Sequence, residues 1–158
     1  MGLDMYLNRK VFIGEEYEHR GVETKCDLKV NGKHINLGGP ISEIKLSGVY
    51  WRKFNALHNW FVENVQDGVD DCTPSLVTKD DIERLIKVLE GLMENYEDDD
   101  YASEYFPTTE GFFFGSTDYD DYYWEDVKET LEDLKGELEW YESMPSELYP
   151  EWEYQSSW

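Results

Sequence analysis

The sequence predicts a single α+β domain over residues 1–158, in which an antiparallel sheet packs against about three helices. Three observations predict this fold class. Strand-like runs rich in aromatic and β-branched residues occur near both ends of the chain. Three segments between and after them repeat apolar residues at helical spacing. No internal repeat or linker divides the chain, and 158 residues is enough for one domain with its own core.

The expected strands are short and separated by turn residues. Residues 3–13 (LDMYLNRKVFI) form the opening strand, and residues 22–37 form a hairpin around Asn31-Gly32, a pair that tolerates the positive φ of a type I′ turn. Gly38-Gly39-Pro40 then breaks the chain, and residues 41–46 (ISEIKL) form another strand. Residues 151–158 (EWEYQSSW) alternate enough to form the last strand.

Three helices follow from the apolar spacing. The first spans about 49–66, with an inner stripe of Phe54, Leu57, Phe61 and Val65, and ends before Asp67-Gly68. The second begins after Thr78, where Asp81 completes a capping-box pattern. The third spans roughly 119–142 and is capped by Ser116, Thr117 or Asp118. Between the last two helices we expect an acidic loop at 97–111 and a buried strand in the run GFFFGST at 111–117.

Charge is distributed very unevenly. Residues 1–58 hold nine Lys and Arg and seven Asp and Glu, a formal charge of +2, whereas residues 59–158 hold five and twenty-nine, a charge of −24. Residues 59–158 therefore repel nucleic acid and anionic membranes, and direct nucleic-acid binding is not expected there. Any anion would have to bind to residues 1–58, and any basic protein partner would bind to the rest.

Several other classes of protein are disfavoured. The sequence contains no run of about 20 apolar residues, the length needed to span a bilayer, and no signal peptide is recognised. A cytoplasmic location is therefore expected. Cys26 and Cys72 are expected to be free thiols. No phosphate-binding glycine loop, serine elbow or zinc-helix signature occurs, so no cofactor and no metal is predicted.

Four stretches together resemble a known family. They are the opening MGLDMYL, the middle segment YWRKFNALHNWFVENVQDGVDDC, the later PTTEGFFFGSTDYDDYYWEDVKETLEDL and the closing EYQSSW. The chain is similar over nearly its whole length to a family of small bacteriophage and prophage proteins that begin Met-Gly-Leu-Asp-Met-Tyr-Leu. The resemblance implies an accessory protein of a phage or mobile element in the bacterial cytoplasm, and counter-defence is a common role for such proteins.

The segment 50–61 (YWRKFNALHNWF) supplies the candidate binding site. In a helix, Trp51, Asn55 and His58 share a face beside the core stripe, with Arg52 close to Asn55. Such side chains can stack on a base, read its edge and pair with a phosphate. The leading hypothesis is therefore a binding protein that sequesters a nucleotide-type ligand without turnover. Its expected site residues are Trp51, Arg52, Lys53, Asn55, His58 and Trp60, with Ser116 and Tyr119 opposite.

Three other interpretations stay open. The polar residues of 50–61 could instead bond neighbouring backbone inside the protein. The carboxylates and tyrosines of residues 94–142 could imitate nucleic acid and inhibit a basic host or defence protein. A small hydrolase could use His58 with Asp70, Asp71 or Cys72, although no diagnostic spacing supports catalysis and no catalytic residue is assigned. A monomer and a homodimer are equally compatible with the sequence.

Overall fold

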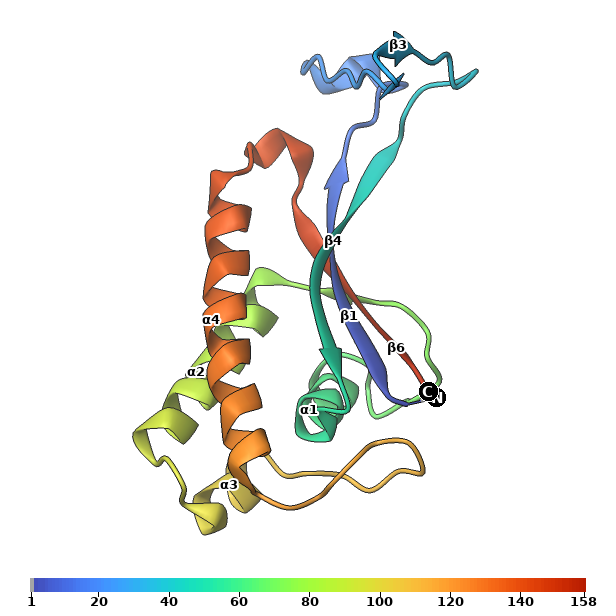
Figure 1. Cartoon of the computed structure of the whole chain (residues 1–158). Coiled ribbons are helices and arrows are strands. Elements are labelled where there is room, and N and C mark those ends of the chain that lie inside the picture. The colour runs from blue at the N-terminus through green and yellow to red at the C-terminus, as the bar shows by residue number, and fades with distance from the viewer. Residues whose placement is uncertain (1) are drawn as a thin grey trace.

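The computed structural model describes residues 2–158 and shows an α+β domain, which confirms the predicted fold class (Figure 1). Four antiparallel strands form the main sheet in the order β4-β1-β6-β5. The strands are β1 (Asp4–Phe12), β4 (Glu43–Arg52), β5 (Ser75–Val77) and β6 (Glu151–Ser157). The helices are α1 (Asn55–Asn64), α2 (Lys79–Glu94), α3 (Asp99–Tyr105) and α4 (Asp121–Ser143).

The hydrophobic core lies between one face of this sheet and the helices. Because side chains alternate along a strand, Leu3, Met5 and Leu7 point inward from β1 and the residue before it, whereas Tyr6 points outward. Trp152 and Tyr154 of β6 are fully buried, and the Tyr154 ring stacks on Phe61 of α1 at 4.0 Å between centroids. This stacking fixes α1 against the centre of the sheet.

Helix α2 starts as the sequence predicts. Thr78 Oγ1 accepts a hydrogen bond from the Asp81 N–H, and the Asp81 carboxylate accepts one from the Thr78 N–H, which completes a capping box. Helix α4 is also confirmed within two residues at each end, but its cap is Asp120, whose carboxylate accepts from the Tyr123 N–H at 3.0 Å. Ser116, Thr117 and Asp118 were the wrong cap candidates.

The segment 49–54 is not helical, contrary to the sequence analysis. Residues 49–52 belong to β4, because they pair with Asp4–Leu7 of β1 in a regular antiparallel register. Lys53 then takes a positive φ of 59°, which ends the strand, and α1 begins only at Asn55. The apolar spacing from Phe54 onward therefore predicted a real helix. In residues 49–52 the same spacing was misleading, because these residues pair with β1 in the sheet.

Two further expectations between α2 and α4 were wrong. The acidic loop contains α3, which begins at Asp98, where the carboxylate accepts from the Tyr101 N–H at 3.0 Å. The run GFFFGST forms a turn and not a strand, and Phe112 is 94% exposed. Only Phe114 of this run is buried, and Gly115, at a φ of 89°, lies against Lys53. A positive φ there prevents an extended strand.

Residues 14–42, here called the arm, project beyond the sheet between β1 and β4 (Figure 1). The arm contains a small hairpin of β2 (Lys29–Val30) and β3 (Lys33–His34), with Asn31 and Gly32 both at positive φ as the turn prediction requires. The flanking strands are much shorter than expected. None of the arm residues belongs to the buried hydrophobic core, so the arm does not position the rest of the fold.

Candidate functional site: a groove between β4 and α4

The structure does not bring the eight predicted site residues together in one wall. Trp51 lies on β4 and is buried, so it does not share a helical face with Asn55 and His58. The exposed members are Arg52, Lys53 and Ser116, and Tyr119 is half-buried. The remaining members, Asn55, His58 and Trp60, are buried on α1.

Asn55 anchors the loop of residues 107–117 that precedes α4. Its Nδ2 donates to the carbonyl oxygens of Phe114 at 3.1 Å and Ser116 at 2.7 Å, and its Oδ1 accepts from the Thr109 N–H at 3.0 Å. Both ends of the amide are therefore used by backbone groups. Asn55 brings Ser116 close to the start of α1, as the sequence analysis expected, but as a structural tether.

His58 belongs to a buried hydrogen-bonded chain. Its Nδ1 lies 2.7 Å from the Tyr154 hydroxyl, and its Nε2 lies 3.0 Å from Asp70 Oδ2. Burial, and then the charge of Asp70, raise the pKa of Tyr154 well above its ordinary value, so the hydroxyl keeps its proton within this hydrogen-bonded chain. Since His58 is only 1% exposed and both ring nitrogens are occupied, it offers no accessible base to a substrate.

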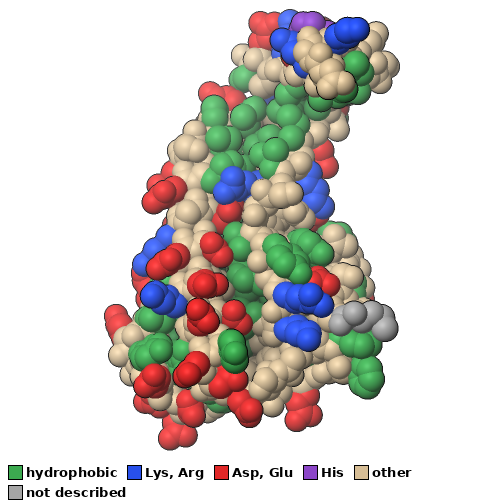
Figure 2. All heavy atoms as spheres, in the orientation of Figure 1, with side chains coloured by type: hydrophobic (Ala, Val, Ile, Leu, Met, Phe, Trp, Pro, Cys, Tyr) green, Lys and Arg blue, Asp and Glu red, His purple; other side chains and the backbone are tan. Residues whose placement is uncertain are grey.

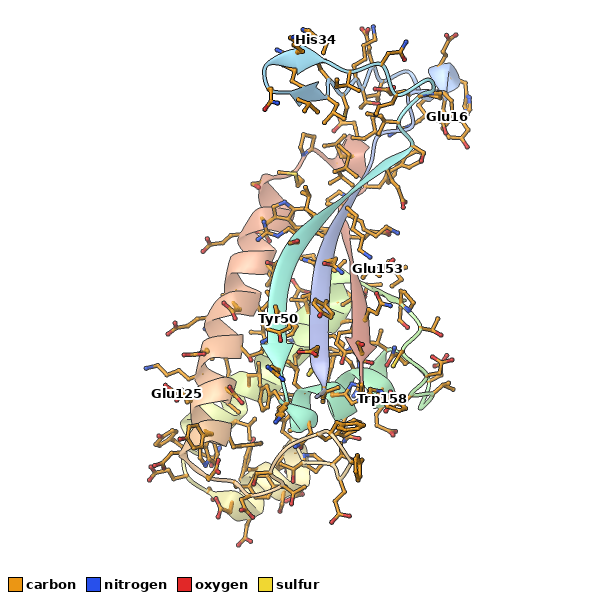
Figure 3. The ribbon with its side chains drawn as sticks, turned by 45° about the vertical axis from the view of Figure 1, so that its right-hand side comes forward. Glu16, His34, Tyr50, Glu125, Glu153 and Trp158 are labelled. Atoms are coloured by element: carbon orange, nitrogen blue, oxygen red, sulfur yellow. The ribbon has the colours of Figure 1, made fainter. Side chains whose placement is uncertain are left out.

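Four of the predicted residues, Arg52, Lys53, Asn55 and Ser116, do line one cavity, which lies at the end of a groove between the second half of β4 and α4. Two cavities lie along it. The end cavity, of about 470 Å³, is lined by Arg52, Lys53 and Asn55 on one side and by Tyr122, Tyr123 and Asp126 on the other. The middle cavity, of about 500 Å³, lies between Gly48, Val49 and Tyr50 of β4 and Glu132, Asp133 and Gly136 of α4, and the ion pair of Arg9 with Glu137 also lines it. We call the two together the strand–helix groove. Figure 3 shows α4 running alongside β4, which carries the labelled Tyr50.

Four carboxylates of α4, here called the acidic row, follow this groove. Asp126, Glu129 and Asp133 share one helix face at spacings of three and four residues, and Glu132 lies beside Asp133. Within residues 2–158 none of the four forms an ion pair, whereas Lys135 of the same helix pairs with Glu90 on α2 at 3.0 Å. In the space-filling view of Figure 2, acidic side chains run down the position of α4.

Two carboxylates of the acidic row, Asp126 and Asp133, have raised pKa values. Burial, followed by the charges of Glu129, Glu125 and Asp120, raises the pKa of Asp126 to about 6. The pKa of Asp133 is also raised, by burial and then by its neighbours Glu129, Glu137 and Glu132. The neighbouring carboxylates therefore make Asp126 and Asp133 harder to ionise, and a cation close to these two groups would relieve that repulsion.

Replacing Asp126 by asparagine should stabilise the protein at high pH. The folded pKa of about 6 exceeds the ordinary 3.8, so folding loses stability as pH rises from about 4 through about 6. We expect Asp126→Asn to raise the free energy of unfolding by about 1 kcal/mol at pH 8 and by almost nothing at pH 4. The gain at pH 8 is smaller than the full pKa shift implies, because the Asp126 carboxyl still contacts water. Urea unfolding at both pH values measures it, with exposed Glu139→Gln as the control. An equal gain at both pH values would contradict the assignment.

Sequence reasoning did not find the α4 side of the groove. The spacing of Asp126, Glu129 and Asp133 is visible in the sequence, but it also fits a solvated helix face. What distinguishes these residues is the strand that lies opposite, and the second half of β4, from residue 49, had been taken for the start of a helix. The acidic interpretation of residues 94–142 did include them without separating them from the other carboxylates.

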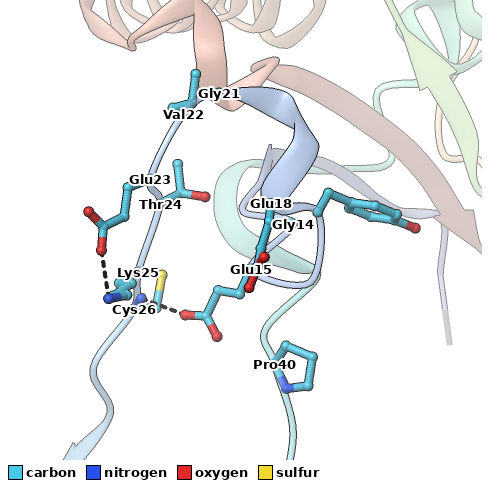
Figure 4. Close-up of a pocket in the computed structure, with 11 residues that line it drawn as sticks. Gly14, Glu15, Glu18, Gly21, Val22, Glu23, Thr24, Lys25, Cys26 and Pro40 are labelled. Atoms are coloured by element: carbon cyan, nitrogen blue, oxygen red, sulfur yellow. Dashed lines mark hydrogen bonds and ion pairs between the residues drawn. The ribbon is translucent and has the colours of Figure 1, made fainter.

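A larger hollow, of about 770 Å³, lies within the arm and is a weaker candidate (Figure 4). Its central carboxylate, Glu15, already accepts hydrogen bonds from the backbone N–H groups of Cys26 at 2.8 Å and Ile41 at 3.0 Å. These two bonds lower the pKa of Glu15 and join the two sides of the arm. We interpret the hollow as the space enclosed by this connection.

Other kinds of site have no support in the part of the chain that the structure describes. Among residues 2–158 no cluster of three or more His, Cys, Asp or Glu is placed to hold a metal ion, and no helix is long and apolar enough to cross a membrane. Cys26 and Cys72 are free thiols. Comparison with known families, curated proteins and solved structures gives no match, so the strand–helix groove has to be interpreted from its own geometry.

Proposed function

We propose that this chain is a binding protein whose strand–helix groove takes a basic segment of another protein. The observation that carries the proposal is the acidic row, whose four carboxylates line or flank a groove without ion-pair partners among residues 2–158. Raised pKa values at Asp126 and Asp133 support it, because they indicate that positive charge is missing close to these two carboxylates, although Arg9 lines the middle cavity and Arg52 and Lys53 line the end cavity. A lysine or arginine side chain would supply that charge.

Capture of a nucleotide has weaker support. A phosphate could pair with Arg52 and Lys53, but in the same cavity it would meet Asp118, Asp120 and Asp126. The formal net charge of −22 adds long-range repulsion. The indoles expected to stack on a base, those of Trp51 and Trp60, are buried in the core. The end cavity therefore suits a ligand that carries positive charge better than a polyanion.

The resemblance to phage and prophage proteins extends this proposal to a biological role. A strongly anionic protein that occupies a basic surface can keep nucleic acid from that surface. We propose that the partner is a basic host or defence protein and that binding inhibits it. This role depends on the groove proposal, since the acidic row is the surface that would meet the partner.

Binding to a synthetic basic peptide tests the proposal. The probe is acetyl-Thr-Lys-Thr-Lys-Thr-Lys-Thr-amide, and isothermal titration calorimetry at low and high NaCl measures its affinity. We expect binding that weakens with salt. The variant Glu132→Gln/Asp133→Asn should lose about tenfold in affinity, since two partly exposed ion pairs are worth about 1–2 kcal/mol together.

The control is Glu63→Gln/Glu94→Gln, which removes the same charge from exposed positions on α1 and α2. It should change affinity less than threefold, a bound we set from the loss of long-range attraction alone. Equal weakening by the two double variants would show that attraction is diffuse and would overturn the groove as the site. Tighter binding of a nucleotide than of the peptide would favour the capture hypothesis instead.

A further inference from the structure

We infer that the basic segment binds in an extended conformation, as an added β-strand on the free edge of β4. This inference rests on the proposed function and specifies the shape of the partner. It comes from the sheet order, in which β4 is an edge strand paired only with β1. An edge strand presents a row of unpaired N–H and C=O groups, and extended peptides bind to such rows in many complexes.

The backbone groups that face the groove can be identified from the pairing. The Lys53 N–H donates to the Leu3 carbonyl at 2.7 Å, so residues 53 and 3 make one of the two bonds of a hydrogen-bonded pair, while the Leu3 N–H donates to the Phe113 carbonyl at 3.1 Å. In antiparallel pairing such pairs alternate with pairs that are not hydrogen-bonded. Trp51 and Val49 therefore face β1, and the N–H and C=O of Tyr50 and Arg52 face away from it. Within residues 2–158 no side chain or loop bonds to those four groups.

The template is the four residues Val49 to Arg52. The register is regular from Arg52 to Val49, opposite residues 4–7 of β1, and shifts between Leu7 and Arg9. Gly48 lies at this shift, where a Cβ would collide with the Leu7 carbonyl. The bulge ends the regular edge on one side, and Lys53 with its positive φ ends it on the other.

Helix α4 provides the second wall for an added strand. Gly136 presents no side chain to the middle cavity, and a Cβ there would meet nothing within 4 Å, so a backbone can approach. Residues four apart on a helix are separated by about 6 Å along its axis, and alternate residues of a strand by about 6.8 Å. Asp133, which lines the middle cavity, and Glu129, which lies one turn before it on the same helix face, therefore match cations at alternate positions of an extended segment.

The side chains of the added strand that point away from α4 would lie on the outer face of the sheet. Tyr50 and Arg52 point to the outer face of the sheet, where Tyr50 contacts Tyr6 at 5.4 Å between ring centroids. Uncharged β-branched or aromatic residues fit beside these rings. The inferred ligand is therefore a strand in which lysine or arginine alternates with residues such as threonine, valine or tyrosine.

A second copy of this chain is a poorer occupant of the same edge. Pairing β4 with β4 would bring together two molecules that each carry a formal charge of −22. It would also place acidic rows near each other with no new cation to separate them. Charge complementarity thus selects a basic partner segment over self-association.

Selective N-methylation of the probe tests the inference. In one version of the alternating peptide the three lysine amides are N-methylated, and in the other the amides of the last three threonines are. In an extended peptide the N–H groups of alternate residues point to opposite edges, so only one of the two sets can donate to β4. We expect the version that is methylated on that set to lose about tenfold or more in affinity for the wild-type protein, and the other version to lose less than threefold. The two versions are matched controls for the conformational effect of methylation. An isomer with its three lysines in sequence should also bind more weakly.

The outcomes separate this inference from the proposed function. Equal affinities of the two methylated versions would overturn strand addition. If Glu132→Gln/Asp133→Asn still weakens binding in that case, the groove binds a basic segment that is not a strand. If that variant binds like the wild type, the proposed function fails as well.

Discussion

Replacing Glu137 by leucine is expected to lower the free energy of unfolding by about 3–5 kcal/mol. Glu137 is 3% exposed and joins three elements. Its Oε2 accepts from Arg9 Nε at 2.9 Å and from Trp152 Nε1 at 2.8 Å, and its Oε1 accepts from Arg9 Nη2 at 2.8 Å. Leucine would leave the partly buried Arg9 guanidinium and the fully buried Trp152 N–H without these hydrogen-bond acceptors.

Urea unfolding followed by tryptophan fluorescence measures this effect. The control is Glu139→Leu, the same substitution at an exposed position two residues further along α4, which should change stability by about 0.5 kcal/mol or less. A loss below 1 kcal/mol for Glu137→Leu would show that Glu137 does not hold α4 against β1 and β6. The alignment of α4 with β4, on which the groove depends, would then need another cause.

Replacing Asn55 by alanine is expected to cost about 2–3 kcal/mol and to loosen residues 107–117. The change removes three hydrogen bonds and leaves the Phe114 and Ser116 carbonyls and the Thr109 N–H without this partner. Hydrogen exchange of residues 107–117 should become faster, because the anchor of this loop is lost.

Asn59 provides a matched control for this prediction. It lies one turn further along α1 and its side chain forms no hydrogen bond within residues 2–158, so Asn59→Ala should leave exchange in the loop unchanged. Unchanged exchange in Asn55→Ala would contradict the tether. It would also reopen a ligand-binding role for the Asn55 amide, which lines the end cavity.

Local sequence signals predicted much of the fold correctly. The capping box at Thr78 and Asp81 is a short-range pattern, so it determines the start of α2 whatever packs around it. The strands β1 and β6 have the aromatic and β-branched residues that a half-buried sheet requires. The apolar stripe of α4 is long enough to be unambiguous.

The errors occur where contacts distant in sequence decide the structure. The local sequence of residues 49–52 fits a helix, but these residues pair with β1 and form part of the sheet. Gly115 and Phe114 form a turn because the loop is held by Asn55, some 60 residues earlier in the chain. The candidate site depended on the first of these errors. Trp51 and His58 share a face only if both lie on one helix, and the carboxylates opposite β4 gain significance only once β4 is known to be an edge strand.

Nuclear magnetic resonance of ¹⁵N-labelled protein titrated with the alternating lysine peptide tests the central claim most directly. Binding in the strand–helix groove predicts that amide shifts concentrate at residues 49–53 of β4 and the turn after it, and at residues 126–136 of α4, with the arm unaffected. Shifts concentrated in the arm, on the outer faces of α2 and α3, or absent at saturating peptide would contradict it.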